Sequence, residues 1–287
     1  MTNNSTAEAR STDRPVRQLS GMEVAVIGVA ATRGRPSTAC MAMETYADLI
    51  CARTPIRTAR IALPRGDART VVSRIAALAS PVTAVFVVGL GPADSTTVQR
   101  RVADHGGPLV ITELDLVTVA LAAAATATLR HNGIAPRHGR IVVTDPERAP
   151  RLGPILLAAS GASVTNWHER DAAAYPLDRV MFDNDVLVDL AGTVAHGAAP
   201  GRILTLPSAL FEYGALVLPG LLSAIGRCAE PTLTHDMLAS CVRALALLTP
   251  ANQVLPDLNQ RLLIPAVARQ VARTLINHPL PRVHPKH

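Results

Sequence analysis

The chain has 287 residues, of which 48% are hydrophobic and 17% charged, with a formal net charge of +6. A chain of this length can bury a large core and is long enough for two domains of ordinary size. No apolar run reaches the roughly 18 residues that a membrane-spanning helix needs, so we expect no helix of this chain to cross a membrane.

The positive charge is carried by arginine, because Lys286 is the only lysine of the chain. The arginines are dispersed, only 2% of the residues are aromatic, and no motif of a nucleic-acid-binding fold is present, so a nucleic-acid partner is not expected. The cysteines contain no Cys-x-x-Cys pair, and we expect buried free thiols rather than a zinc site or a disulfide framework. They are Cys40, Cys51, Cys228 and Cys241.

The first 20 residues are polar and lack the apolar segment of a signal peptide, so we expect a disordered leader over 1–20 in a cytoplasmic protein. Beyond it, apolar runs of strand length alternate with longer helical patterns, which is typical of βαβ units with parallel strands. The predicted strands are Glu23–Val29, Arg60–Leu63, Thr83–Val88, Leu109–Ile111, Arg140–Thr144, Ser163–Asn166, Val180–Phe182, Val186–Leu190 and Arg202–Leu206. The predicted helices between them are Ala39–Ala52, Ala68–Ala79, Ser95–Asp104, Leu114–Arg130 and Arg148–Ser160.

After Leu206 the pattern becomes helical, and Thr234 is a plausible N-cap for one of the helices. The predicted helices here are Gly214–Arg227, Thr234–Leu247 and Leu263–Ile276, followed by a frayed tail over 278–287. We place the domain boundary just before the helix at Leu114. This gives a smaller N-terminal α/β domain (21–113) and a Rossmann-like domain with C-terminal helices (114–277). The predicted fold class is α/β with a doubly wound parallel sheet.

Three segments follow one another in an order and spacing typical of one enzyme family. The first runs from Pro108 to Val143, with an acidic turn and an Ala/Leu-rich helix after a strand; the second combines Leu216–Ile225 with the helix that starts at Thr234. The third, Val254–Ala272, has an Ile-Pro turn that leads into an Ala/Val-rich helix. These segments resemble the bacterial-type malic enzymes (malate oxidoreductases, decarboxylating). The resemblance spans about 22–275 and implies a shortened malic enzyme fold.

The resemblance also implies a lysine that acts as base, a divalent metal held by three carboxylates, and a nicotinamide cofactor at a glycine-rich turn. The family's Met-Glu-Gly-Lys stretch falls on Met43-Glu44-Thr45-Tyr46, which puts Tyr46 at the position of the lysine. A neutral phenol, with a reference pKa of about 10, is a poor base at pH 7. Of the metal carboxylates only Glu113 remains, with Asp115 two residues later. Alternatively, one of these two acids only caps the long helix.

The positions for cofactor and substrate are altered in the same way. Where the family has Gly-x-Gly-x-x-Gly, this chain has Asp145-Pro-Glu-Arg-Ala-Pro150, in which Asp145 and Glu147 bring negative charge and Pro150 lacks an amide donor. Glu169 follows the next strand and is a candidate to hold a ribose, although a plain surface glutamate is the alternative. At the substrate end, the resemblance puts the family's Ala-Asn-Pro on Leu206-Pro207-Ser208 and its double asparagine on Tyr213-Gly214.

Outside the family pattern, His196 follows a predicted strand in Gly192-Thr-Val-Ala-His-Gly197. Ligands bind in loops at the carboxyl ends of parallel strands, so His196 is a candidate to line a cleft with Ser208 and Tyr213. The other interpretation is an exposed loop histidine.

The losses together favour a pseudoenzyme with a structural, regulatory or ligand-binding role, a homo-oligomer such as a dimer, and no bound cofactor. Two alternatives stay open. One is an enzyme of different chemistry that reuses the cleft with Tyr46, Glu113, Asp115, His196 and Tyr213. The other is residual malate oxidoreductase activity, which would require NAD or NADP and a divalent metal.

Overall fold

The computed structural model describes residues 22–30, 38–64, 66–78, 82–194, 202–227 and 232–277. The expected leader over 1–20, the tail over 278–287, and the positions of His196 and Cys228 lie outside the described residues. None of the helices in the described ranges is long and apolar enough to cross a membrane.

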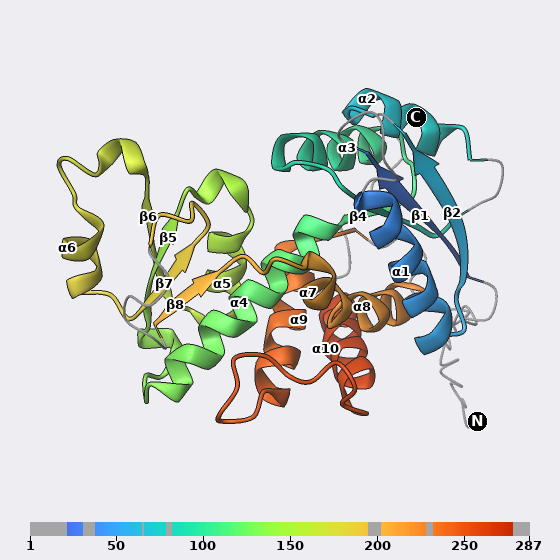
Figure 1. Ribbon diagram of the computed structural model, residues 1–287. Coiled ribbons are helices and arrows are strands. Elements are labelled where there is room, and N and C mark those ends of the chain that lie inside the picture. Colours follow the sequence, from blue (N-terminus) through green and yellow to red (C-terminus); the bar gives the residue numbers. More distant parts are fainter. Residues whose placement is uncertain are drawn as a thin grey trace, which may run out of the picture.

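The first half of the chain forms a parallel sheet, sheet A, with the strand order β2-β1-β3-β4. Its strands are β1 (Glu23–Val29), β2 (Arg57–Leu63), β3 (Ala84–Val88) and β4 (Leu109–Thr112). The two central strands, β1 and β3, are buried almost throughout, which is why both have continuous apolar sequences. Helices cover both faces of this sheet, with α2 (Ala68–Ala76) and α3 (Pro92–Asp104) on one side and α1 (Thr38–Arg53) on the other (Figure 1).

The second parallel sheet, sheet B, has the order β6-β5-β7-β8. Its strands are β5 (Arg140–Thr144), β6 (Ser163–Trp167), β7 (Val186–Asp189) and β8 (Ile203–Thr205), with α5 (Leu152–Ser160) after β5. One face of this sheet packs into the main core, while the other carries a small cluster around Val142, Trp167 and Leu187. Two parallel sheets with flanking helices confirm the predicted α/β class.

The predicted strand Val180–Phe182 is wrong, because these residues end the helix α6 (Leu177–Phe182). Leu177, Val180 and Met181 pack together against the small cluster of sheet B. Their spacing of three and four residues is the helical one, and a run of three apolar residues was too short to reveal it.

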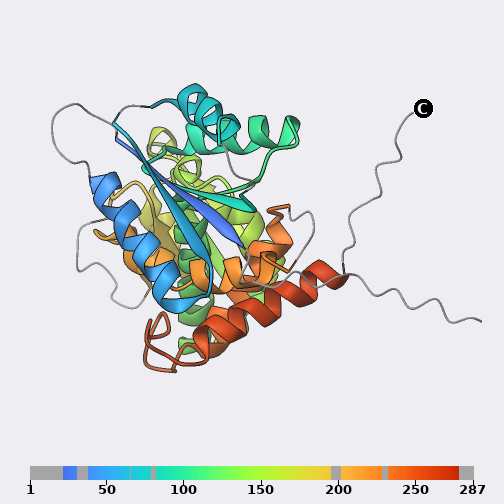
Figure 2. The ribbon, with the colours of Figure 1, turned by 90° about the vertical axis from the view of Figure 1, so that its right-hand side faces the viewer.

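The long helix α4 (Glu113–His131) joins the two sheets and is buried from Asp115 to Leu129. The C-terminal helices α7 (Leu210–Ala215), α8 (Leu218–Ile225), α9 (His235–Leu248) and α10 (Leu263–Asn277) complete the molecule. In Figure 2 the red helix α10 lies along the lower edge of the molecule. One hydrophobic cluster runs from Val26 and Phe86 of sheet A through α4 to Ile141 of sheet B and to α9.

Two predicted helix boundaries need correction. The predicted helix Gly214–Arg227 is divided into α7 and α8, and Pro219, which has no amide hydrogen to donate, lies in the first turn of α8. The predicted helix Arg148–Ser160 begins only at Leu152, after a 3-10 turn over Pro146–Arg148.

Thr234 caps α9 as predicted, because its side chain accepts a hydrogen bond from the Met237 amide. The proposed domain boundary before Leu114 stays a prediction.

Candidate functional site

Tyr46, at the position expected for the family lysine, is fully buried on α1. Its ring makes an edge contact with Phe86 of β3 and a tilted contact with Phe211 of α7, each with centroids 4.8 Å apart. The phenol oxygen lies against the backbone of α7, since a Cβ atom added to Gly214 would come within 2.1 Å of it. The structure therefore brings together Tyr46 and Gly214, which stand where the family's lysine and one of its asparagines were expected.

The hydroxyl of Tyr46 makes no hydrogen bond of regular geometry among the described residues, but the Glu113 carboxyl lies close enough to interact with it. Burial raises the pKa of this phenol far above its ordinary value, and the negative charge of Glu113 raises it further. Burial also raises the pKa of the Glu113 carboxyl. At neutral pH Tyr46 is therefore an uncharged side chain, buried beside the Glu113 carboxyl.

Asp115 caps the long helix, as one of the two interpretations of this acid predicted. Thr112 is the N-cap of α4: its hydroxyl oxygen accepts from the Asp115 amide at 3.4 Å while its own amide donates to Asp115 Oδ2 at 2.8 Å, which forms a capping box. The Thr112 hydroxyl also donates to Asp115 Oδ2 at 2.7 Å. Glu113 lies in the same first turn. Within the described ranges, no group of three or more His, Cys, Asp or Glu side chains is arranged to hold a metal ion.

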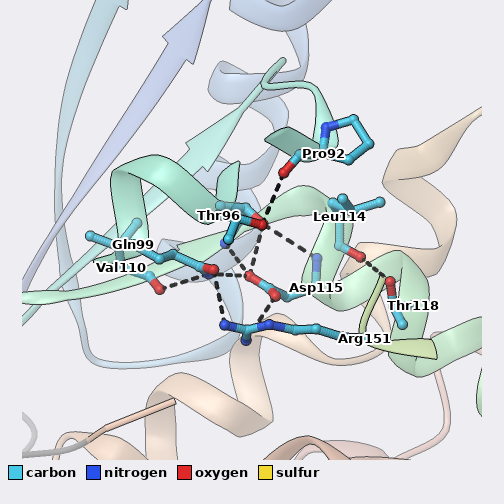
Figure 3. A network of polar contacts seen from close by, with 9 residues as sticks. Pro92, Thr96, Gln99, Val110, Leu114, Asp115, Thr118 and Arg151 are labelled. Carbon is cyan, nitrogen blue, oxygen red and sulfur yellow. Dashed lines mark hydrogen bonds and ion pairs between the residues drawn. The ribbon is translucent and has the colours of Figure 1, made fainter. Parts of the chain in front are cut away.

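Asp115 has two further partners that the sequence did not reveal. Gln99 on α3 donates to Asp115 Oδ2, and the guanidinium of Arg151, just before α5, pairs with Asp115 Oδ1 (Figure 3). Neither partner lies on the same helix as Asp115, so no local motif connects them to it.

Three backbone amides of the turn after β5 donate hydrogen bonds to carbonyls within the protein. Asp145 has a left-handed φ of 43°, and its amide donates to the Trp167 carbonyl at 3.0 Å. The amides of Arg148 and Ala149 donate to the carbonyls of Asp145 and Pro146 at 3.0 and 3.1 Å. These amides are therefore already bonded within the protein.

Glu147, Pro150 and Glu169 lie on the surface beside this turn. Glu147 Oε2 is 3.5 Å from Nδ1 of His168, while Glu169 begins a short 3-10 turn. At the other end of the candidate site, Ser208 is exposed and Tyr213 is half-buried, and burial raises the pKa of Tyr213. No hydrogen bond joins Ser208 to Tyr213 in the described part of the chain.

Sequence reasoning missed Asp189, which ends β7 and is 1% exposed. Its Oδ1 accepts from the Thr144 hydroxyl at 2.8 Å and the Gly192 amide at 3.0 Å, and its Oδ2 accepts from the Val194 amide at 3.0 Å. Burial works to raise the pKa of this carboxyl, but the hydrogen bonds outweigh it and lower the pKa. An acid directly after a buried apolar strand and before Leu-Ala-Gly-Thr was the available signal.

Thr144 and Asp189 end the neighbouring strands β5 and β7 of sheet B. Chain connections leave these two strands in opposite directions, and such switch points are where parallel sheets bind ligands. Here the Thr144–Asp189 hydrogen bond spans that point, and Arg148 Nη1 donates to the Leu190 carbonyl at 3.0 Å beside it.

Solved structures with the same arrangement of sheets and helices identify the fold. The malic enzyme from Pyrococcus horikoshii Ot3 superimposes with a TM-score of 0.71 at 14% identity, over 94% of this chain and 79% of that one. The chain has the malic enzyme fold. The NAD-dependent malic enzyme from Thermotoga maritima gives 0.70 at 16% identity, over 88% and 84% of the two chains. The Entamoeba histolytica malic enzyme gives 0.71 at 13% identity, over 94% and 72%.

At the level of sequence, neither a protein-family model nor a curated protein matches this chain. The malic enzyme likeness predicted from three short segments is thus confirmed as a likeness of fold.

Proposed function

We propose that this protein is a pseudoenzyme of the malic enzyme fold, with a structural, regulatory or ligand-binding role. The observation that carries the proposal is the packing of Tyr46. Its phenol is held between Phe86, Phe211 and the backbone of Gly214, without exposure to solvent. A general base must reach the proton that it removes and must have a pKa near the working pH, and Tyr46 meets neither requirement.

The groups around Glu113 do not fit a divalent metal. Mg²⁺ and Mn²⁺ prefer several oxygen ligands, usually with more than one carboxylate. Asp115, the nearest acid in sequence to Glu113, is already bonded to Thr112, Gln99 and Arg151. A metal would have to break these contacts to gain a second carboxylate.

The turn after β5 does not fit a dinucleotide either. A pyrophosphate is bound by free backbone amides at the start of a helix, where glycines allow close approach. The amides of Asp145, Arg148 and Ala149 are bonded internally, and the acidic side chains of Asp145 and Glu147 would repel phosphate. We therefore propose that NAD and NADP do not bind at this turn.

The test measures binding and turnover on the full chain. NAD, NADP and malate, each with and without Mn²⁺, are titrated by calorimetry, and NADH or NADPH formation is followed by absorbance. The Thermotoga maritima malic enzyme, assayed in parallel, shows that the conditions support catalysis. We expect no cofactor binding and no reduced cofactor above the no-enzyme rate. Turnover at an ordinary enzymatic rate would refute the proposal and favour residual oxidoreductase activity.

The proposed role also includes a homo-oligomer, such as a dimer. Sedimentation velocity over a range of protein concentrations measures the oligomeric state directly. If the protein sediments as a monomer at all concentrations, a structural role within a homo-oligomer is excluded, and the regulatory and ligand-binding roles stay open.

A further inference from the structure

A closed ring of three side chains joins helices that belong to the two sheets (Figure 3). Gln99 Nε2 on α3 donates to Asp115 Oδ2 at 2.7 Å. Arg151 Nη2 donates to Gln99 Oε1 at 3.0 Å. Arg151 Nη1 closes the ring as an ion pair, 3.1 Å from Asp115 Oδ1, without the alignment of a hydrogen bond. The amide of Gln99 thus uses both its donor and its acceptor across the ring.

The carboxylate of Asp115 has a double role in this ring. It completes the cap of α4 through Thr112, and it also holds the charge of Arg151. The Asp115 side chain is only 4% exposed and that of Arg151 is 27% exposed, so solvent screens the pair less than it would on an open surface. Removing either partner leaves a shielded charge without compensation, which is costly.

The ring adds polar contacts between two parts of the chain that are joined mainly by apolar packing, with the hydrogen bond from Arg53 to Asn259 as a further polar contact between them. Gln99 lies on α3, which covers sheet A, and its Nε2 also donates to the carbonyl of Val110 in β4 at 3.3 Å. Arg151 lies between the turn after β5 and α5, which packs on sheet B and α9. The interface between packed units within one chain restrains their relative motion, and here the ring adds directional polar contacts to the apolar ones. A rotation of one unit against the other would break the contacts of Arg151 with Gln99 and Asp115.

We propose that Gln99, Asp115 and Arg151 form an interdomain lock, which makes the sheet A and sheet B units open and unfold as one body. The lock does not depend on whether the protein is a catalyst. Gln99 and Arg151 lie outside the three segments that carry the malic enzyme resemblance, whereas Asp115 lies within one of them, and its contacts also argue against a metal beside Glu113. The two proposals are tested separately, because hydrogen exchange and unfolding report on the lock, while cofactor binding and turnover report on the pseudoenzyme.

Hydrogen exchange tests the lock across the two units. The variant Arg151→Met keeps the length of the stem but removes the guanidinium, and amide exchange is measured by mass spectrometry on peptides from α3, α4 and α5. We expect exchange in α3 and in the first turn of α4 to become about three- to tenfold faster, although the substitution lies in the other unit.

Arg148→Met is the matched control. Arg148 lies three residues before Arg151, but its contacts stay within the sheet B unit, with the Leu190 carbonyl and Asp145. It should change exchange near its own turn and leave α3 as in the wild type. Unchanged exchange in α3 of Arg151→Met would overturn the proposal.

A double-mutant cycle between Gln99→Leu and Arg151→Met gives the second readout. These residues contact each other directly, so the double variant should lose less stability than the two single losses predict. We expect a coupling of about two- to fivefold in the unfolding equilibrium constant, because Arg151 is partly exposed. If Arg151→Met does not fold, Gln99→Leu alone is tested by exchange in α5. Strict additivity, or wild-type exchange in α5 of Gln99→Leu, would overturn the lock.

Discussion

Tyr46 stands where the malic enzyme resemblance expects a catalytic lysine, and Asp145 begins the turn where it expects glycines that bind a cofactor. The two regions differ in the kind of contacts that occupy these positions. Around Tyr46 the side chains come from α1, β3 and α7, and they meet only because the chain is folded. At Asp145 the contacts are polar, and most of them join residues within the same turn. Apolar side chains from distant parts of the chain pack around Tyr46, whereas hydrogen bonds between neighbouring residues hold the turn at Asp145.

This difference predicts how each region responds to change. A substitution that disturbs Tyr46 or Gly214 affects packing between distant elements, so its cost should appear in the global free energy of unfolding. A substitution at the turn after β5 affects a few local bonds, so its cost should be small.

Tyr46→Lys should have the largest effect. It restores the residue type that the malic enzyme resemblance expects, but it places an ammonium group among Phe86, Phe211 and the main core, with the half-buried Glu113 carboxyl as its nearby counter-charge. Burying a charge with imperfect pairing costs several kcal/mol, and we expect the free energy of unfolding to fall by about 3 kcal/mol or more. Urea denaturation measures this loss. Malate oxidation should stay at the no-enzyme rate, and a stable variant that oxidises malate would show that a usable site is still present.

Gly214→Ala should be the next most disruptive change. The new methyl group would lie 2.1 Å from the Tyr46 oxygen, so α1 or α7 has to shift. Overpacking of this kind costs about 1–3 kcal/mol. Gly153→Ala in α5 is the matched control, because its Cβ would meet nothing nearer than 3.8 Å, and we expect it to be neutral or slightly stabilising. In the Tyr46→Phe background Gly214→Ala should cost less, since the clashing oxygen is gone; an equal cost in both backgrounds would refute the contact.

The sequence predicted the strands of both sheets because buried parallel strands need continuous apolar runs, as in β1 and β3. It also identified the cap of α9, since Thr234 and the helix that it caps are adjacent in the chain. It did not reveal the fit of Tyr46 against Gly214, because that contact depends on how α1 packs against α7. The ring of Gln99 and Arg151 around Asp115 was missed for the same reason.

Asp189→Asn should cost about 1–3 kcal/mol at neutral pH. The amide nitrogen cannot accept the bonds that the carboxylate receives from Thr144, Gly192 and Val194, so a buried donor loses its partner. Because the folded pKa of Asp189 lies below its ordinary value, the wild type has this stabilisation above the unfolded pKa. It loses that stabilisation as the pH falls through the folded pKa. Urea midpoints should therefore differ between the two proteins at pH 7 and converge in acid; a pH-independent difference would contradict this assignment.

Asp145→Gly should have the smallest effect and the opposite sign. Asp145 is the one non-glycine residue with positive φ in the described part of the chain, and glycine adopts this backbone conformation without steric cost. The greater freedom of glycine in the unfolded chain and the loss of the weak contact to Arg148, at 3.8 Å, offset part of the gain. We expect the free energy of unfolding to rise by about 0.5 kcal/mol, whereas Asp145→Ala should lower it by about 1 kcal/mol, because alanine suffers the strain without the local polar contacts of aspartate. NAD binding should not appear in Asp145→Gly, since the amides of Arg148 and Ala149 remain bonded within the turn. If this one substitution created a nucleotide site, then side-chain charge alone, and not the internally bonded backbone, would be what keeps phosphate from the turn.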